Sequence, residues 1–80
     1  MKHKYEMPDG TIIQGDSYES VVLAMAQMKL NEVRSIEGYR RETARRAWEM
    51  YRVKVDPSTN KSFITSMVDS RLMRDLKAGL

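Results

Sequence analysis

The side chains of this chain that are best suited to binding charged groups are its arginines, and most of them lie in one segment. Residues 34–54 hold seven of the fourteen Lys and Arg residues but only three of the eleven acidic residues, a net charge of seven minus three, or +4. The rest of the chain has seven bases and eight acids, so the formal charge of +3 comes from this segment. Because guanidinium groups donate a rigid fork of hydrogen bonds, such a segment can bind phosphates or carboxylates.

Side chains that could support catalysis are scarce. His3 is the only histidine, close to the start of the chain, and there is no cysteine. A general base must be held in a fixed orientation, so His3 is interpreted as an ordinary strand residue. No His, Asp or Glu cluster has metal-ligand spacing, and Gly10 and Gly15 are too isolated for a phosphate-binding loop. We therefore expect no enzyme, no catalytic or metal-binding residue and no cofactor.

Size and composition predict one small domain, residues 1–80, in the cytoplasm. A hydrophobic fraction of 41% and a charged fraction of 31% are typical of a folded domain. The absence of cysteine suits a reducing compartment. The longest apolar run, residues 21–26, is far shorter than a membrane span, and the first residues do not form a signal peptide. We therefore expect no membrane partner.

Turn signals and periodicity predict an α+β fold, an N-terminal two-stranded β-hairpin followed by three α-helices. His3, Tyr5 and Met7 alternate with charged residues, which is the period of a strand, and residues 7–10 (Met-Pro-Asp-Gly) have the composition of a turn. The hairpin is predicted over residues 2–14. The helices are predicted over about residues 17–31, 37–53 and 60–77.

The helix starts also have capping signals. Asp16 or Ser17 can cap the first helix, and Asp16 with Glu19 has the spacing of a capping box. Thr59 or Asn60 can cap the third. That helix is predicted to end near Gly79 and to bury six apolar residues: Phe63, Ile64, Met67, Val68, Leu72 and Leu76.

The first helix has two apolar sides. One carries Tyr18, Val21, Val22, Met25 and Met28; the other, roughly 120° away, carries Leu23, Ala26 and Leu30. A helix that is apolar on two sides is usually central in its fold. We expect it to lie between the hairpin and the other helices. The alternative is a homodimer formed through the Leu23, Ala26 and Leu30 side.

The second helix combines a predicted core face with a basic face. The core is expected to include Ile36, Ala44, Ala47, Trp48 and Tyr51, which would make Trp48 unsuitable as a stacking platform. Arg41, Arg45 and Arg52 project within about 40° of one another at 100° per residue.

The remaining basic residues of this helix have their own expected neighbours. Arg46 lies beside Glu42, and Glu37–Arg41 and Arg45–Glu49 have the spacing of helix-surface ion pairs. Arg40 falls in the apolar face, so it must extend past its neighbours or find a carboxylate. Met50 projects away from that face.

Nucleic-acid binding is one possible function of the basic segment. Residues 40–48 (Arg-Arg-Glu-Thr-Ala-Arg-Arg-Ala-Trp) resemble arginine-rich RNA-binding helices, and residues 60–69 distantly resemble the recognition helix of winged-helix repressors of the multiple-antibiotic-resistance type. The second resemblance implies groove-facing residues Lys61, Ser62, Thr65, Ser66 and Arg71. Against it, Val53 to Thr59 is longer than a tight turn, and a charge of +3 is modest for a duplex binder.

Protein binding is the interpretation we favour. Interfaces are enriched in Arg, Trp, Tyr and Met, and the chain has seven Met, four Tyr and one Trp. Its short N-terminal strand, Met-Pro-Asp-Gly turn, capped helix and Ala-Arg-Arg-Ala-Trp helix resemble small accessory proteins of phages and mobile elements. That resemblance implies a regulator or inhibitor that binds a host protein. The predicted partner-binding residues are Arg40, Arg41, Arg45, Arg46, Glu49, Met50 and Arg52.

Overall fold

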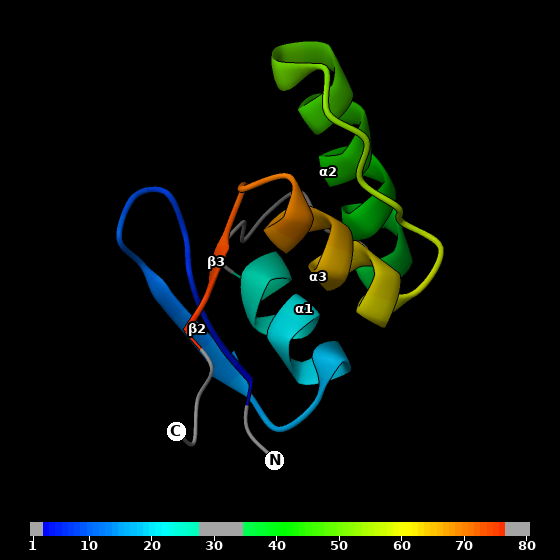
Figure 1. The fold of residues 1–80 in the computed structure, drawn as a ribbon. Helices are drawn as coiled ribbons and strands as arrows, with labels where there is room; N and C mark the ends of the chain where they lie inside the picture. Colours follow the sequence, from blue (N-terminus) through cyan, green and yellow to red (C-terminus); the bar gives the residue numbers. More distant parts are fainter. Residues whose placement is uncertain (1–2, 28–34, 77–80) are drawn as a thin grey trace.

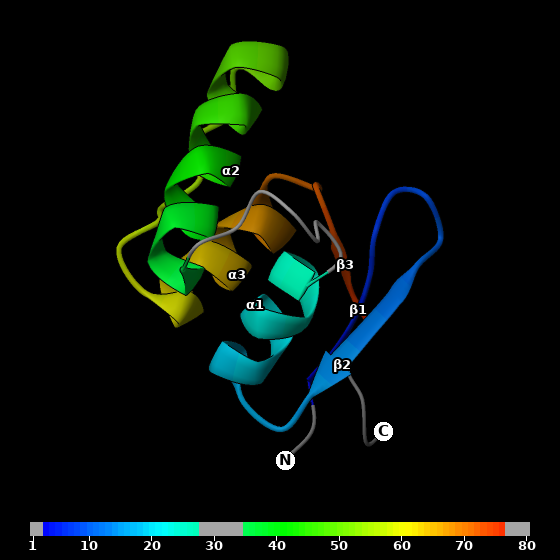
Figure 2. The same cartoon turned by 180° about the vertical axis from the view of Figure 1, so that it is seen from behind.

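A computed structural model of the chain describes residues 3–27 and 35–76. They form strands β1 (His3–Glu6), β2 (Ile12–Gly15) and β3 (Arg74–Asp75), and helices α1 (Tyr18–Gln27), α2 (Ile36–Tyr51) and α3 (Asn60–Asp69). The strands make one antiparallel sheet in the order β2-β1-β3, and α1 lies between it and the other two helices (Figures 1 and 2). The α+β class is confirmed, with three strands in place of the predicted two.

The β1–β2 hairpin is set by its turn chemistry. The Gly10 N–H donates to the Met7 carbonyl at 2.9 Å, and the Met7 N–H donates to the Thr11 carbonyl at 2.8 Å. Gly10 has a φ of 90°, a conformation that glycine adopts without steric cost. The register pairs Tyr5 with Ile13, and both side chains are buried. A hairpin is therefore confirmed, but its second strand includes Gly15, one residue past the predicted range of 2–14.

Helix α3 ends at Asp69, eight residues before the predicted end at residue 77. The Arg71 N–H donates to the Val68 carbonyl at 3.0 Å and the Leu72 N–H donates to the Met67 carbonyl at 2.9 Å, which is a Schellman motif. The prediction was wrong because the spacing of Leu72 continues the helical period although the chain has already turned. Gly79 lies outside the described residues.

Strand β3 follows that turn and was not predicted. Asp75 pairs with Tyr5 and Arg74 with Glu6, and the Leu76 N–H donates to the Lys4 carbonyl at 2.9 Å. Leu76, predicted on a helix, therefore follows a strand. The addition of β3 brings the end of the described chain beside its beginning.

The core is built around α1, as expected from its two apolar sides. Helix α1 contacts β2, α2 and α3, and its buried residues are Val21, Val22, Met25 and Ala26. Phe63, Ile64 and Met67 of α3 are buried against them. Ala26 is only 4% exposed, so its predicted place in a dimer surface was wrong; Leu23 is 42% exposed and Leu30 lies outside the described residues.

Hydroxyl groups cap the helices. The Ser17 and Ser20 side chains accept each other's backbone N–H, at 3.1 and 3.0 Å, in place of the Asp16–Glu19 capping box that the spacing predicted. The Thr59 Oγ1 accepts the Ser62 N–H at 3.0 Å, which confirms Thr59 as the cap of α3. These bonds fix where α1 and α3 begin.

Candidate interaction surface at the end of helix α2

Helix α2 extends past the elements on which it packs. Ser35 caps its start, where the Oγ accepts the Gly38 N–H at 3.0 Å. The helix has 16 residues, about 24 Å at 1.5 Å per residue, whereas α3 has 10 residues, about 15 Å. In Figures 1 and 2 its C-terminal end stands clear of α1, α3 and the sheet. Because α1 and α3 do not reach the last turns of α2, the side chains of these turns are exposed.

The exposed end of α2 carries three large apolar side chains. Trp48 is 46% exposed, Met50 is 67% exposed and Tyr51 is 59% exposed. The guanidinium carbon of Arg52 lies 5.4 Å from the centre of the Trp48 ring, which is cation–π distance. We refer to Trp48, Tyr51 and Arg52, together with Met50 on the other side of the helix end, as the outer patch.

The prediction that Trp48 and Tyr51 are core residues was wrong. Ala47 on the same helix is buried, with 4% exposure, so the position of the inward face was identified correctly. Trp48 and Tyr51 are exposed because they lie beyond the reach of α1 and α3. The aromatic residue of α2 that does enter the core is Tyr39, whose ring packs edge-on against Phe63 with centroids 6.0 Å apart. Helical periodicity does not reveal how far the neighbouring helices extend.

Several arginines of α2 are paired with glutamates of the same helix. Arg41 pairs with Glu37 at 2.6 Å, Arg45 with Glu49 at 2.9 Å, and Arg46 with Glu42 at 3.0 Å. All three predicted pairs are confirmed. Because all these side chains are at least 43% exposed, each pair adds only about 0.3–0.5 kcal/mol to stability. Much of the positive charge counted in the sequence is therefore balanced locally.

Arg52 is not part of the arginine stripe that the helical geometry predicted. Helix α2 ends at Tyr51, and Arg52 takes a left-handed conformation with a φ of 56°, its N–H donating to the Trp48 carbonyl at 3.0 Å. Its guanidinium therefore faces Trp48, and only Arg41 and Arg45 remain on the stripe. Met50 is exposed as expected, and at 100° per residue it projects about 160° away from Trp48, on the other side of the helix end.

Arg40 was predicted as a partner-binding residue, and its contacts are internal. Its Nε donates to the Pro57 carbonyl at 2.9 Å, and its Nη1 donates to the Asn60 side-chain oxygen. The arginine thus ties α2 to the start of α3. Its acceptors are neutral oxygens rather than the carboxylate that its position on the apolar face suggested. Arg40 therefore helps to hold α2 against the start of α3.

Helix α3 uses two of its proposed groove-facing residues for local bonds. The Ser66 hydroxyl accepts the Asp56 N–H at 2.9 Å and donates to the Ser62 carbonyl at 2.7 Å, while Ser62 takes part in the cap of its own helix. Lys61, Thr65 and Arg71 are exposed. The opposite face carries Phe63, Ile64 and Met67 into the core, as the sequence of this helix predicted.

The pKa shifts in this structure follow from packing and turn geometry. Burial raises the pKa of Tyr39, and burial together with the Asp75 charge raises the pKa of Tyr5 to about 12. Backbone and side-chain bonds from Thr11 lower the pKa of Asp9, and bonds from Ser58 lower the pKa of Asp56. These groups belong to the core and the turns, where burial and local hydrogen bonds account for their pKa shifts.

Comparison with known proteins finds no relative. No family model, curated protein or solved structure matches the chain. Within residues 3–27 and 35–76, no three His, Asp or Glu side chains gather where they could hold a metal ion. In the same ranges, no helix has the length and apolar character needed to cross a membrane.

Proposed function

We propose that this protein is a non-catalytic binding protein that attaches to a partner protein through the outer patch. The observation that carries the proposal is the exposure of Trp48, Met50 and Tyr51 within four residues of one helix end. Single exposed apolar residues are ordinary on protein surfaces, whereas a group of them marks a contact site. Trp, Tyr and Arg are also the residues that contribute most to binding energy at interfaces.

The size of the driving force can be judged from burial. Fully covering a large apolar side chain contributes about 1.5–3 kcal/mol, so a partner that completes the burial of side chains that are 46%, 67% and 59% exposed gains roughly 3–5 kcal/mol. Association itself costs at least about 4 kcal/mol in lost freedom, so the patch needs a surrounding rim. The Arg45–Glu49 pair and Arg41 lie on the same helix and supply that rim.

The partner that we favour is a host protein, with this chain acting as a small regulator or inhibitor from a phage or mobile element. The resemblance of the turn and the Arg-rich helix to such proteins supports this choice. Arg41 and Arg45 would contact acidic groups of the partner at the rim. Charge complementarity there raises the association rate more than it raises the affinity. Predicted residues Arg46, Glu49 and Met50 remain in the proposed contact region; Arg40 does not.

Capture of a partner from host lysate tests the proposal. The test variant carries Trp48→Ser and Tyr51→Ser, and the control carries Ile12→Ser, because Ile12 on β2 has the same 46% exposure as Trp48. We expect nuclease-treated lysate to yield one stoichiometric protein with the wild type and the control. Recovery should fall at least about tenfold with the double variant. Equal recovery with the double variant would place the contact elsewhere.

Single-stranded nucleic acid is the second candidate partner, and one observation favours it. Trp48 is exposed with a guanidinium over its ring, an arrangement on which a base can stack. The measurement is fluorescence anisotropy with labelled DNA and RNA at two salt concentrations. A binder that neutralises several phosphates loses at least about a hundredfold in affinity between 50 and 200 mM salt. Absence of binding at low salt would remove this candidate.

A further inference from the structure

The apolar side chains of the outer patch are spread around the end of α2 rather than gathered on one side. Tyr51 lies between the other two: at 100° per residue, Trp48 projects about 60° from it on one side and Met50 about 100° on the other. Together they span an arc of about 160°. A helix that packs on one surface buries a stripe of about 100°, so a flat contact centred on Tyr51 would leave Trp48 and Met50 partly uncovered.

The end of α2 is a projecting element that is already formed. Figures 1 and 2, from opposite sides, show its last turn clear of the other helices and the sheet. The Arg52 N–H donates to the Trp48 carbonyl at 3.0 Å, which closes this turn, and the chain then runs back along the helix. Ala44, Trp48 and Tyr51 also have the spacing of zero, four and seven residues that is typical of helices bound in apolar grooves.

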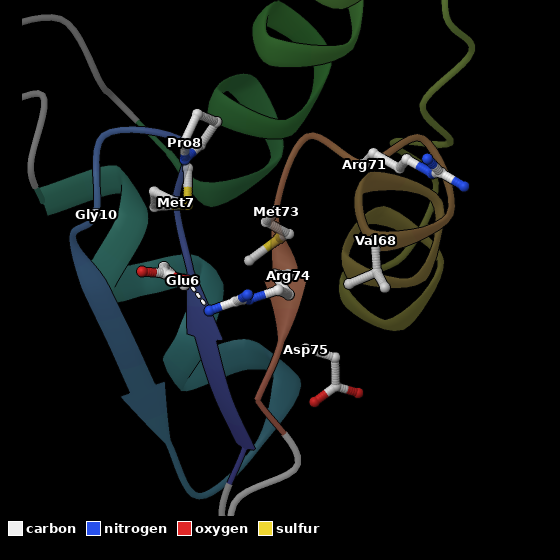
Figure 3. Close-up of a pocket in the computed structure, with 9 residues that line it drawn as sticks. All are labelled: Glu6, Met7, Pro8, Gly10, Val68, Arg71, Met73, Arg74 and Asp75. Carbon is white, nitrogen blue, oxygen red and sulfur yellow. Dashed lines mark hydrogen bonds and ion pairs between the residues drawn. The ribbon is translucent and has the colours of Figure 1, made fainter.

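A hollow surface exists in the described part of the protein, but it lies elsewhere. A pocket of about 670 Å³ is lined by the hairpin turn, the end of α3 and the residues around β3 (Figure 3). Glu6 and Arg74, which form an ion pair, are part of this lining. No residue of the outer patch lines the pocket. At the outer patch this chain therefore supplies a convex element, and the concave side of the contact has to come from the partner.

The segment that ends α2 is basic. Residues 45–54 hold four Lys or Arg residues and one acidic residue, a net charge of four minus one, or +3. Arg45 pairs with Glu49 at 2.9 Å, whereas the guanidinium of Arg52 lies over the Trp48 ring. Lys54 is exposed two residues further on. Because surfaces of opposite charge are steered together, these cations favour a partner with acidic groups beside its apolar contact.

We propose that the partner protein encloses the end of α2 in a concave apolar groove with acidic edges. This inference rests on the proposed function and specifies the shape and charge of the partner. The floor of the groove contacts Tyr51, and its two walls contact Trp48 and Met50. The acidic edges lie beside Arg52 and Lys54. Met50 is thus a contact residue, although it projects away from Trp48.

Binding measurements with single variants test this shape. The probe is the protein that the wild type captures from nuclease-treated host lysate, purified and titrated against each variant by isothermal calorimetry. Trp48→Ser, Tyr51→Ser and Met50→Ser should each weaken binding at least about fivefold, because each loses one apolar contact in the groove. Met50→Leu should stay within about twofold of the wild type, since it keeps an apolar side chain of similar volume. Ile12→Ser, on β2, is the control and should bind like the wild type.

Two further measurements complete the test. Met50 is 67% exposed, so Met50→Ser should unfold at the wild-type midpoint in circular dichroism, which separates a lost contact from a lost fold. The association rate should fall at least about threefold between about 50 and 500 mM salt, because salt screens the attraction between the basic helix end and the acidic edges.

The outcomes distinguish this inference from the proposed function. If Met50→Ser binds like the wild type while Trp48→Ser does not, the contact is flat; the groove is then overturned and the proposed function stands. An association rate that is independent of salt overturns the acidic edges. Absence of any captured protein contradicts the proposed function, and this inference with it.

Discussion

Replacing Arg40 by alanine should destabilise the fold, whereas replacing the adjacent Arg41 should not. Arg40 donates from Nε to the Pro57 carbonyl and from Nη1 to the Asn60 side chain, and it is partly buried. Arg41 is 72% exposed and pairs only with Glu37 in the described chain. The two substitutions remove the same atoms from neighbouring positions of α2. Any difference in stability therefore reports the link between α2 and α3.

The expected magnitude follows from the number and setting of the bonds. A hydrogen bond from a charged donor contributes about 1.5–3 kcal/mol when buried, and partial exposure reduces the two bonds of Arg40 to about 2 kcal/mol together. For a domain of this size, that loss lowers the thermal midpoint by roughly 10 °C. Arg41→Ala should cost less than about 0.5 kcal/mol, since its ion pair is at the surface.

Urea denaturation followed by far-UV circular dichroism is the appropriate assay. Arg40→Lys is a useful third variant, because it keeps the charge but lacks the planar fork that reaches two acceptors. We expect it to lie between the wild type and Arg40→Ala. If Arg40→Ala and Arg41→Ala have midpoints within error of each other, the inter-helix link is not a stabilising contact. Arg40 would then again be a candidate residue for contact with a partner protein.

Three further predictions concern the cap, the core and the pH dependence. Thr59→Ala should lower stability by about 1 kcal/mol in urea titration and Thr59→Ser should preserve it, because the hydroxyl accepts the Ser62 N–H. Ile64→Val should cost about 0.5–1.5 kcal/mol and Phe63→Ala about 3–5 kcal/mol by the same assay, since both side chains are at most 1% exposed. Burial raises the pKa of Tyr5 from 10.0 to about 12 in the folded protein, so its contribution to stability is complete below pH 10 and is lost as pH rises toward 12; Tyr5→Phe should flatten this part of the stability profile.

Local signals in the sequence were enough to place the elements that depend on local chemistry. Residues 7–10 contain the proline and glycine that a tight turn requires, and Thr59 is a side chain that caps a helix start. The exposed pairs of α2 followed from four-residue spacing. In each case the interacting groups lie within a few residues of one another, so their contact can be predicted from the sequence spacing without knowledge of the tertiary fold.

Features that depend on distant segments could not be predicted in this way. Strand β3 exists because Arg74 and Asp75 reach β1 across the length of the chain, and two residues carry no strand period. The end of α3 was missed because its left-handed position holds Arg71 rather than glycine. A sequence pattern that continues past a turn cannot show that the backbone has changed direction.

The arginines of α2 show why a charge count is a poor guide to the contact surface. Arg41, Arg45 and Arg46 have carboxylate partners on their own helix, and Arg40 is held by oxygens of the next segment. These groups already have acceptors, so a partner gains less from them than free guanidinium groups would offer. The apolar residues at the end of α2 differ from these arginines, because the helix extends beyond α3 and leaves them exposed. A 16-residue helix packed on a 10-residue one leaves Trp48 and Tyr51 about half exposed, and a second molecule that covers them would gain the free energy of burying the remaining apolar surface. The length of the helix, more than its charge, therefore directs the search for a partner to the outer patch.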